Sequence, residues 1–290
     1  MPVRRESFVQ TLRAQWLGQQ MRQLREQRGI TLKQAAEFLE RDFSSIARWE
    51  RAEWPFRRGV VVSLLDLYGE HDGRERNRFI QLAEDAWRTD RWDADYDELV
   101  DASFIDFPWL ESRAERIYSW DAFLMPGLMQ TPAYAEAVIR NAEGESATDF
   151  SVGKWLQLRI DRQRVLARDP SVRVAAIIDE SVLRRPVGGS AVMRGQLNHL
   201  GDLIGQPNID VRVLPARVGL HAGLDGSFVL FGMPKPYPEV AYAETLGGRR
   251  FMESPTSKRY ALAYDRLRAV ALDRREAAEL IAEIKEGLHE

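Results

Sequence analysis

Five short segments between residues 17 and 88 repeat their apolar residues at helical spacing, with a turn of a few residues between neighbours. The first places Leu17, Met21 and Leu24 on one helix face and stops at Gly29. The other four are expected at about 32–39, 43–51, 60–68 and 73–88. Helices this short depend on packing against one another. The pattern therefore predicts a compact all-α bundle in this part of the chain.

Two of the predicted helices have clear start signals. Thr31 with Gln34 three residues later forms a capping box for the second helix, and Asp42 is the expected N-cap of the third. Because only residues 40–42 separate them, this pair has the dimensions of a helix-turn-helix. In such a unit the second helix enters the DNA major groove, while the first crosses the phosphate backbone.

The outward positions of this pair are the expected contacts with double-stranded DNA. They are Lys33, Gln34, Phe43, Ser44, Ser45, Arg48, Arg51 and Arg57. Arg48 and the serines can hydrogen-bond base edges or phosphates, and Phe43 can touch a thymine methyl group. Lys33 and Gln34 lie where free helix amides add to phosphate binding. A plain helical bundle with solvated arginines would show the same spacing and stays open as an alternative.

The charge of the chain is distributed unevenly. Residues 1–60 hold 12 Lys and Arg against 7 Asp and Glu, whereas the whole chain has 41 against 44. Residues 84–106 contain nine acids and two arginines, with several aromatic residues among them. A basic head followed by an acidic junction is typical of a polyanion-binding module on a different body. If the junction covers the head when DNA is absent, neutralising Asp93, Asp95 and Asp97 should tighten non-specific DNA binding.

Composition excludes several classes of protein. The absence of cysteine rules out a disulfide scaffold, a cysteine-ligated zinc site and a thiol nucleophile. The longest apolar runs have five or six residues, whereas a membrane-spanning helix needs about 20. The first residues also lack the apolar segment of a secretory signal. We therefore expect a soluble, cytoplasmic protein associated with the nucleoid, with no membrane partner.

The second half of the chain has a mixed pattern. The expected strands are residues 172–179, 209–214, 227–232 and 240–243, and the expected helices are residues 110–118, 132–139, 149–168, 190–204, 255–271 and 274–288. The strand–helix–strand run from 172 to 214 is a βαβ unit, in which the two strands are parallel. The overall expectation is an α+β protein: an all-α five-helix head (1–88), an acidic aromatic junction (89–110) and a mixed α/β regulatory domain (111–290) with a small sheet.

This domain offers only scattered candidates for chemistry. Polar residues near predicted strand ends are Asp179, Glu180, His221, Asp225 and Glu244. Their spacing fits neither a metal site nor a catalytic triad. Arginines within Arg159–Arg164 could clamp an anion, although arginines on helices are usually solvated. We therefore expect no catalytic residue, no cofactor and no metal ion.

Two groups of motifs resemble known families. GITLKQAAEFLERDFSSIARWERAEWP is similar to the helix-turn-helix of the phage-repressor-like, or xenobiotic-response-element, family. That family commonly has glycine near Glu40 and near Ala52, so the backbone of those turns is expected to differ or be strained. Segments such as LMPGLMQTPAYA, LRIDRQRVL and VRVLPARVGLHAGLDGSF resemble the domain of unknown function that follows this motif in many actinobacterial regulators.

The resemblance implies a transcriptional regulator, associated with development or secondary metabolism and often encoded beside a small companion protein. We expect a sequence-specific DNA-binding homodimer whose second domain senses a small molecule or a companion protein. Two alternatives remain. The first is an antitoxin-like partner-binding protein that regulates its own operon, and the second is an enzyme whose helix-turn-helix head targets it to DNA.

Overall fold

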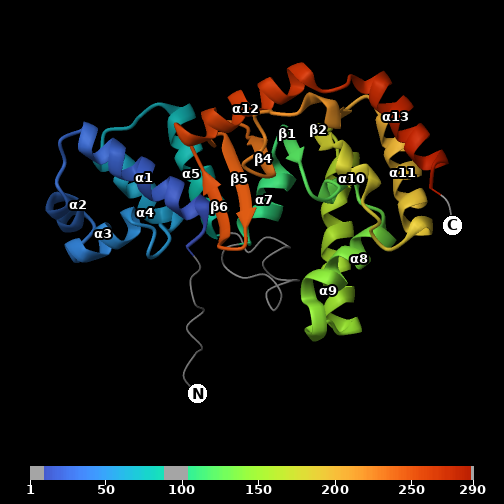
Figure 1. Cartoon of the computed structure of the whole chain (residues 1–290). Coiled ribbons are helices and arrows are strands. Elements are labelled where there is room, and N and C mark those ends of the chain that lie inside the picture. The colour runs from blue at the N-terminus through green and yellow to red at the C-terminus, as the bar shows by residue number, and fades with distance from the viewer. Residues whose placement is uncertain (1–9, 88–103, 289–290) are drawn as a thin grey trace. The chain divides into compact units, whose positions relative to one another are not determined.

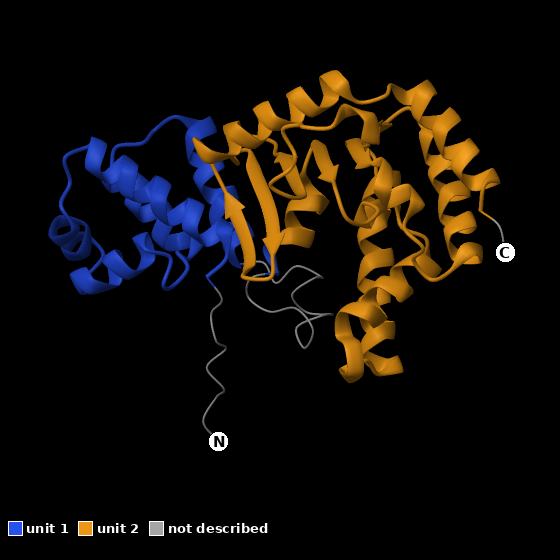
Figure 2. Ribbon diagram, viewed as in Figure 1, with its two compact units in different colours: residues 1–106 blue, residues 107–290 orange. Residues whose placement is uncertain are grey.

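The computed structural model describes residues 10–87 and 104–288. The chain forms two compact units, residues 1–106 and 107–290, which Figure 2 colours separately. Most of the expected acidic junction, including Asp93, Asp95 and Asp97, lies outside the described residues. The expected domain boundaries and the covering role of that junction therefore stay predictions.

Within its described part, unit 1 is a bundle of five helices, as the apolar spacing predicts (Figure 1). They are α1 (Leu12–Gln27), α2 (Leu32–Phe38), α3 (Phe43–Glu50), α4 (Arg58–Leu67) and α5 (Gly73–Trp87). Leu17, Met21, Ile46 and Leu64 are fully buried and form its core. Trp49 is only partly buried, and the centre of its ring lies 5.6 Å from that of Phe56.

The start signals of α2 and α3 behave differently. The capping box of α2 is present: Thr31 Oγ1 accepts from the Gln34 amide at 3.2 Å, and the Thr31 amide donates to Gln34 Oε1 at 2.8 Å. Asp42 occupies the N-cap position of α3, but its side chain makes no capping hydrogen bond. The position of the helix start is thus correct, while the expected carboxylate cap is wrong.

Both turns around α3 contain a residue in the left-handed region. Glu40 has φ 53° and Ala52 has φ 55°, and neither is a glycine. A side chain in this region is crowded by its own backbone, which costs about 1–2 kcal/mol. The expected strain at the two positions where the family commonly has glycine is therefore confirmed.

Unit 2 is a mixed α/β domain. Its helices are α7 (Asp106–Arg113, which begins at the unit boundary), α8 (Pro132–Glu143), α9 (Asp149–Gln163), α10 (Glu180–Arg184), α11 (Ser190–Ile204), α12 (Thr256–Val270) and α13 (Arg274–Glu286). Its strands are β1 (Arg116–Asp121), β2 (Arg173–Asp179), β3 (Ile209–Leu214), β4 (Phe228–Gly232), β5 (Val240–Thr245) and β6 (Gly248–Met252).

The described strands form one sheet in the order β3-β2-β1-β4-β5-β6. The pairs β1–β2 and β2–β3 are parallel, while the remaining pairs are antiparallel. Parallel pairing of β2 with β3 across α10 and α11 confirms the βαβ unit expected from the sequence. The helix α12 covers one sheet face, where Trp120, Ile177 and Leu267 share a core.

The expected helix over residues 110–118 is correct for residues 110–113 and wrong for residues 114–118. The helix α7 ends at Arg113, and Ile117 and Trp120 belong to β1, a central strand that pairs on both sides. Leu110, Ala114 and Ile117 happen to fall at helical spacing, so the pattern continued past the true helix end. Pairing with β2 and β4 overrides it. The edge strand β6 was also missed.

Candidate nucleic-acid interface

The third helix of unit 1 has one buried and one exposed side. Ile46 is fully buried and Glu50 is 9% exposed, and both face the bundle. At about 100° per residue, Arg48 lies nearly opposite both of them. Ser44 and Ser45 flank Arg48 and are partly exposed, and Phe43 at the first position of the helix is 64% exposed. Ser44, Ser45 and Arg48 therefore form one outward surface, whereas Phe43 lies on the Glu50 side of the helix, where it lines a hollow with Lys33.

A buried ion pair and a close backbone approach fix the orientation of α3. Arg25 on α1 donates from two nitrogens to both carboxylate oxygens of Glu50, at 2.6 and 2.9 Å. Beside it, Gly18 allows α1 to approach the end of α3, because a Cβ there would lie 2.7 Å from the carbonyl oxygen of Glu50. Neither feature was predicted from the sequence, although a glycine inside a helix is a visible signal of close packing.

The outward side of α3 is available for contacts. Arg48 is exposed, and its Nε makes a 3.3 Å hydrogen bond to the Ser44 carbonyl oxygen of its own helix. Within residues 10–87, neither Arg48 nor Arg41 forms an ion pair with a carboxylate. Arg41 lies in the turn between α2 and α3 and lines a hollow together with Ser45. Arg41 therefore belongs with the candidate contacts, and its position in the turn of the helix-turn-helix is the sequence signal for it.

Both expected contact residues of α2, Lys33 and Gln34, are exposed, and each already has a neighbour within α2 or its cap. The Lys33 side chain is 84% exposed, and its ammonium lies 3.9 Å from Glu37. Gln34 is also exposed, but its Oε1 accepts the Thr31 amide and hydroxyl. That oxygen therefore serves the capping box, and only the amide NH₂ of Gln34 is left to donate to a phosphate.

The two arginines after α3 are held by neighbours. Arg51 forms an exposed ion pair with Glu53 at 2.6 Å. The guanidinium of Arg57 lies 5.3 Å from the centre of the Trp87 ring. An exposed ion pair is worth little, so Arg51 can exchange Glu53 for a phosphate. Arg51 and Arg57 follow α3 in the chain and do not belong to the outward surface of that helix.

In unit 2, the scattered polar candidates have separate settings. Asp179 caps α10 by accepting from the Ser181 amide, and Glu180 accepts from the Ala216 amide at 3.0 Å. Glu244 pairs with Arg249 at 2.9 Å. His221 and Asp225, by contrast, line one cavity. Among the residues that the structure describes, no three His, Cys, Asp or Glu side chains gather to hold a metal ion.

The arginine-rich turn of α9 is partly buried rather than solvated. Arg162 is 8% exposed and donates to both oxygens of Glu111 at 2.6 and 2.9 Å. Arg159 donates to Gln130 at 2.6 Å, and burial together with the neighbouring Arg162 lowers its pKa to about 10. Gln163 also donates to the Gln130 carbonyl oxygen at 2.7 Å. This segment therefore holds the loop around Gln130 in place.

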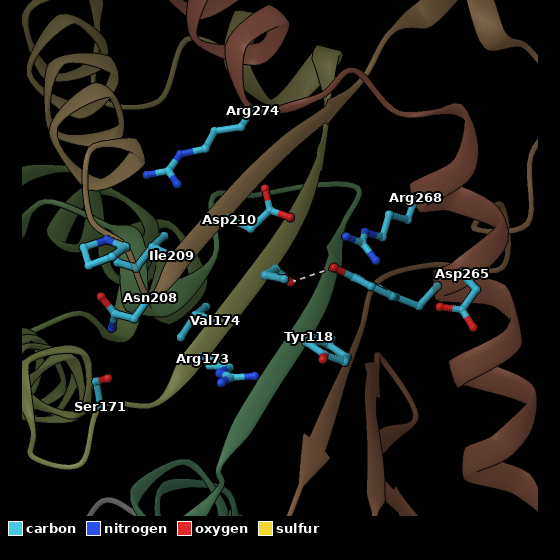
Figure 3. A pocket seen from close by; sticks show the side chains of 13 residues that line it. Tyr118, Ser171, Arg173, Val174, Asn208, Ile209, Asp210, Asp265, Arg268 and Arg274 are labelled. Carbon is cyan, nitrogen blue, oxygen red and sulfur yellow. Dashed lines mark hydrogen bonds between the residues drawn. The ribbon is translucent and has the colours of Figure 1, made fainter.

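A second cavity, of about 470 Å³, lies beside the first residues of β2 and β3 (Figure 3). Tyr118 and Tyr264 stack there, 5.1 Å apart, and the Tyr264 hydroxyl donates to the Ala175 carbonyl oxygen. Several charged groups of this cavity already have partners in the protein: Asp210 pairs with Arg212, and Arg274 donates to the Gln206 carbonyl oxygen.

No described helix is long and apolar enough to cross a membrane.

Comparison with known proteins assigns both halves of the chain. Residues 16–79 match the family described as helix-turn-helix domain, and residues 104–283 match the domain of unknown function DUF5753. No curated protein and no solved structure shows significant similarity to this chain. The matched order, an XRE-like helix-turn-helix followed by this domain, is the order that the sequence motifs suggest. The chain belongs to the DUF5753 family, as a DNA-binding regulator with an amino-terminal helix-turn-helix.

Proposed function

We propose that the chain is a sequence-specific transcriptional regulator that reads its operator with α3. The observation that carries this proposal is the two-sided character of the helix: Glu50 and Ile46 are buried, and Arg48 points the opposite way. Ser44, Ser45 and Arg48 then contact base edges in the major groove. Phe43 contacts a thymine methyl group at the start of the helix.

Phosphate contacts set the position of the helix in the groove. Lys33 and the Gln34 amide contact one side of the groove, and Arg51 and Arg57 contact the other. Each phosphate contact releases counterions, so the affinity falls steeply as salt rises. A single head with a few such contacts binds weakly. Two heads joined in a homodimer bind a palindrome with half-sites about one helical turn apart.

The DUF5753 domain is the proposed regulatory part. It responds to a small molecule or to a companion protein, and it thereby changes how the two heads are spaced. The cavities of unit 2 and its exposed apolar residues support this role, since either kind of effector needs such a surface. The resemblance noted for these motifs suggests control of development or secondary metabolism.

The test is genome-wide mapping of the sites that the full chain occupies, with and without the adjacent genes. We expect recurring palindromes, and inserting about half a helical turn between the half-sites should abolish tight binding. Occupancy that changes with a neighbouring gene would identify a companion protein as the effector. Binding without any shared sequence would contradict the proposed operator reading.

A further inference from the structure

A cavity of about 680 Å³ in unit 2 lies between α12 and the segment that leads into β4. Thr256, Arg259, Leu262 and Arg266 line it from α12. The facing wall runs from His221 to Phe228, without Gly223. Its volume falls within the range of about 300–1,000 Å³ that is typical of small-molecule sites.

The cavity lies beside the end of the sheet at which β1 ends and β4 begins. From β1 the chain continues to β2 and β3 on one side, and then crosses to β4 on the other side of β1. The last residues of β1 and the first of β4 therefore meet, and the Ala122 amide donates to Ser227 Oγ at 2.9 Å. In open sheets with parallel strands, ligands bind at strand carboxyl ends where the direction of winding changes. Ser227 and Phe228, which line the cavity, mark that place.

The loop wall is held rigidly against β1. Trp120 Nε1 donates to the Gly223 carbonyl oxygen at 2.9 Å, and a Cβ on Gly223 would lie 2.4 Å from that nitrogen. The His221 ring packs edge-on to Trp120 at 5.3 Å, and its Nδ1 accepts from the Gly223 amide. In neutral His221 the hydrogen is therefore on Nε2, which is a donor. A wall that is ordered beforehand costs a ligand less entropy on binding.

The lining combines unpaired positive charge with exposed apolar surface. Arg259 and Arg266 are seven residues apart, about two turns, and so share one face of α12. In the part of the chain that the structure describes, neither forms an ion pair with a carboxylate. Leu262 lies between them and is 64% exposed, and Leu224 of the loop is 62% exposed. Asp225 is the acidic residue of the lining.

We propose that this cavity binds a small amphipathic anion. A carboxylate or phosphate of the ligand pairs with Arg259 and Arg266, and its apolar body covers Leu224 and Leu262. Pairing satisfies two guanidinium groups with charge-assisted hydrogen bonds, and covering the leucines removes apolar surface from water. The site itself needs no DNA. Only its role as the effector site rests on the proposed function.

The binding test uses the full chain and the fluorescent probe 8-anilino-1-naphthalenesulfonate, which carries an aromatic ring system and one sulfonate. We expect saturable binding that weakens about tenfold in Arg259→Gln/Arg266→Gln, the loss of roughly one charge-assisted contact. Leu224→Ser should weaken it as well. The matched control is Arg268→Gln, because Arg268 lies on the same helix but lines the other cavity. Thermal melts of every variant show whether the fold is retained.

Competition identifies the class of ligand. Decanoate should displace the probe, whereas decanol, which lacks the charge, and acetate, which lacks the chain, should displace it poorly. The proposal is overturned if the probe does not saturate, if Arg268→Gln weakens binding as much as the paired substitution, or if decanol competes as well as decanoate.

A second measurement separates the site from its regulatory role. Operator affinity of the full chain is measured with and without decanoate, for the native protein and for Arg259→Gln/Arg266→Gln. A change seen only in the native protein supports the cavity as the effector site. A different outcome is also informative: the probe binds through the two arginines, but decanoate leaves operator affinity unchanged. That outcome would support the binding site and contradict ligand control of DNA binding.

Discussion

Arg25 on α1 and Glu50 at the last position of α3 form a buried bidentate ion pair, with nitrogen–oxygen distances of 2.6 and 2.9 Å. A third nitrogen–hydrogen group of Arg25 donates to the Ile30 carbonyl oxygen at 2.7 Å. The pair therefore connects α1, the turn before α2 and the end of α3. Because Arg48 lies opposite Glu50 on the helix, this contact decides which residues α3 presents outward.

Removing one partner of this pair should be costly. Arg25→Met leaves the Glu50 carboxylate buried without its cation, and we expect it to lower the free energy of unfolding by about 3–5 kcal/mol. Arg25→Met/Glu50→Met buries no charge and should cost less than the two single substitutions together. Urea unfolding measures all three. Strictly additive costs would mean that the pair does not act as a unit.

The close approach of α1 and α3 predicts a specific sensitivity at Gly18. The Cβ of Gly18→Ala would lie 2.7 Å from the Glu50 carbonyl oxygen, so the helices must separate. We expect a loss of about 1–3 kcal/mol in the free energy of unfolding and weaker operator binding. Gly59→Ala on α4 is the matched control, since nothing lies within 4 Å of its added Cβ. Equal effects of the two substitutions would contradict the packing described.

The two left-handed residues should respond differently to glycine. Glu40 is exposed, so Glu40→Gly relieves backbone crowding without loss of packing and should stabilise unit 1 by roughly 0.5–1 kcal/mol. Ala52 is only 1% exposed, and losing its methyl group offsets the gain by about 0.8 kcal/mol. Thermal melts should therefore rank Glu40→Gly above Ala52→Gly. The reverse order would show that backbone crowding does not decide the outcome.

Asp121 at the end of β1 predicts a pH dependence of stability. Burial raises its pKa from 3.8 to about 7, and the hydrogen bond with Ser119 lowers it by less. Because the folded state holds this proton more tightly, the carboxyl favours folding at low pH, and that contribution is lost as the pH rises through about 7. Asp121→Asn cannot titrate.

The melting temperature of the native chain should therefore fall relative to Asp121→Asn between about pH 4 and pH 7, by roughly 2–4 °C for each kcal/mol lost. Melts in matched buffers at several pH values measure the difference. Curves that stay parallel over this range would show that the pKa of Asp121 is not raised.

The helical bundle was predictable because its signals are local. Leu17, Met21 and Leu24 mark one helix face, and Thr31 with Gln34 marks a start, all within a few residues. The burial of Glu50 was not, since it depends on Arg25, which is distant in sequence. The sequence pattern treats a charged residue as exposed unless its partner is known.

The sheet shows the same limit. The strand β2 has a continuous apolar run and β3 alternates apolar with charged residues, and both were found. The strand β1 was taken for the end of a helix because Leu110, Ala114 and Ile117 mimic helical spacing. Pairing partners far along the chain decide such a segment. The cavity between α12 and the loop around His221 also depends on the packing of distant segments. Only its separate residues could be named in advance.

The most direct measurement is the affinity of the full chain for its mapped operator, by fluorescence anisotropy, with Arg48→Ala and Arg275→Ala compared in one buffer. Arg275 is an exposed arginine on α13, paired with Glu279. Replacing it with alanine removes one positive charge, as Arg48→Ala does. We expect Arg48→Ala to cost about 1–3 kcal/mol and to relax the preference at one base pair, while Arg275→Ala binds as the native chain does. Unchanged operator binding by Arg48→Ala would contradict the assignment of α3 to the major groove.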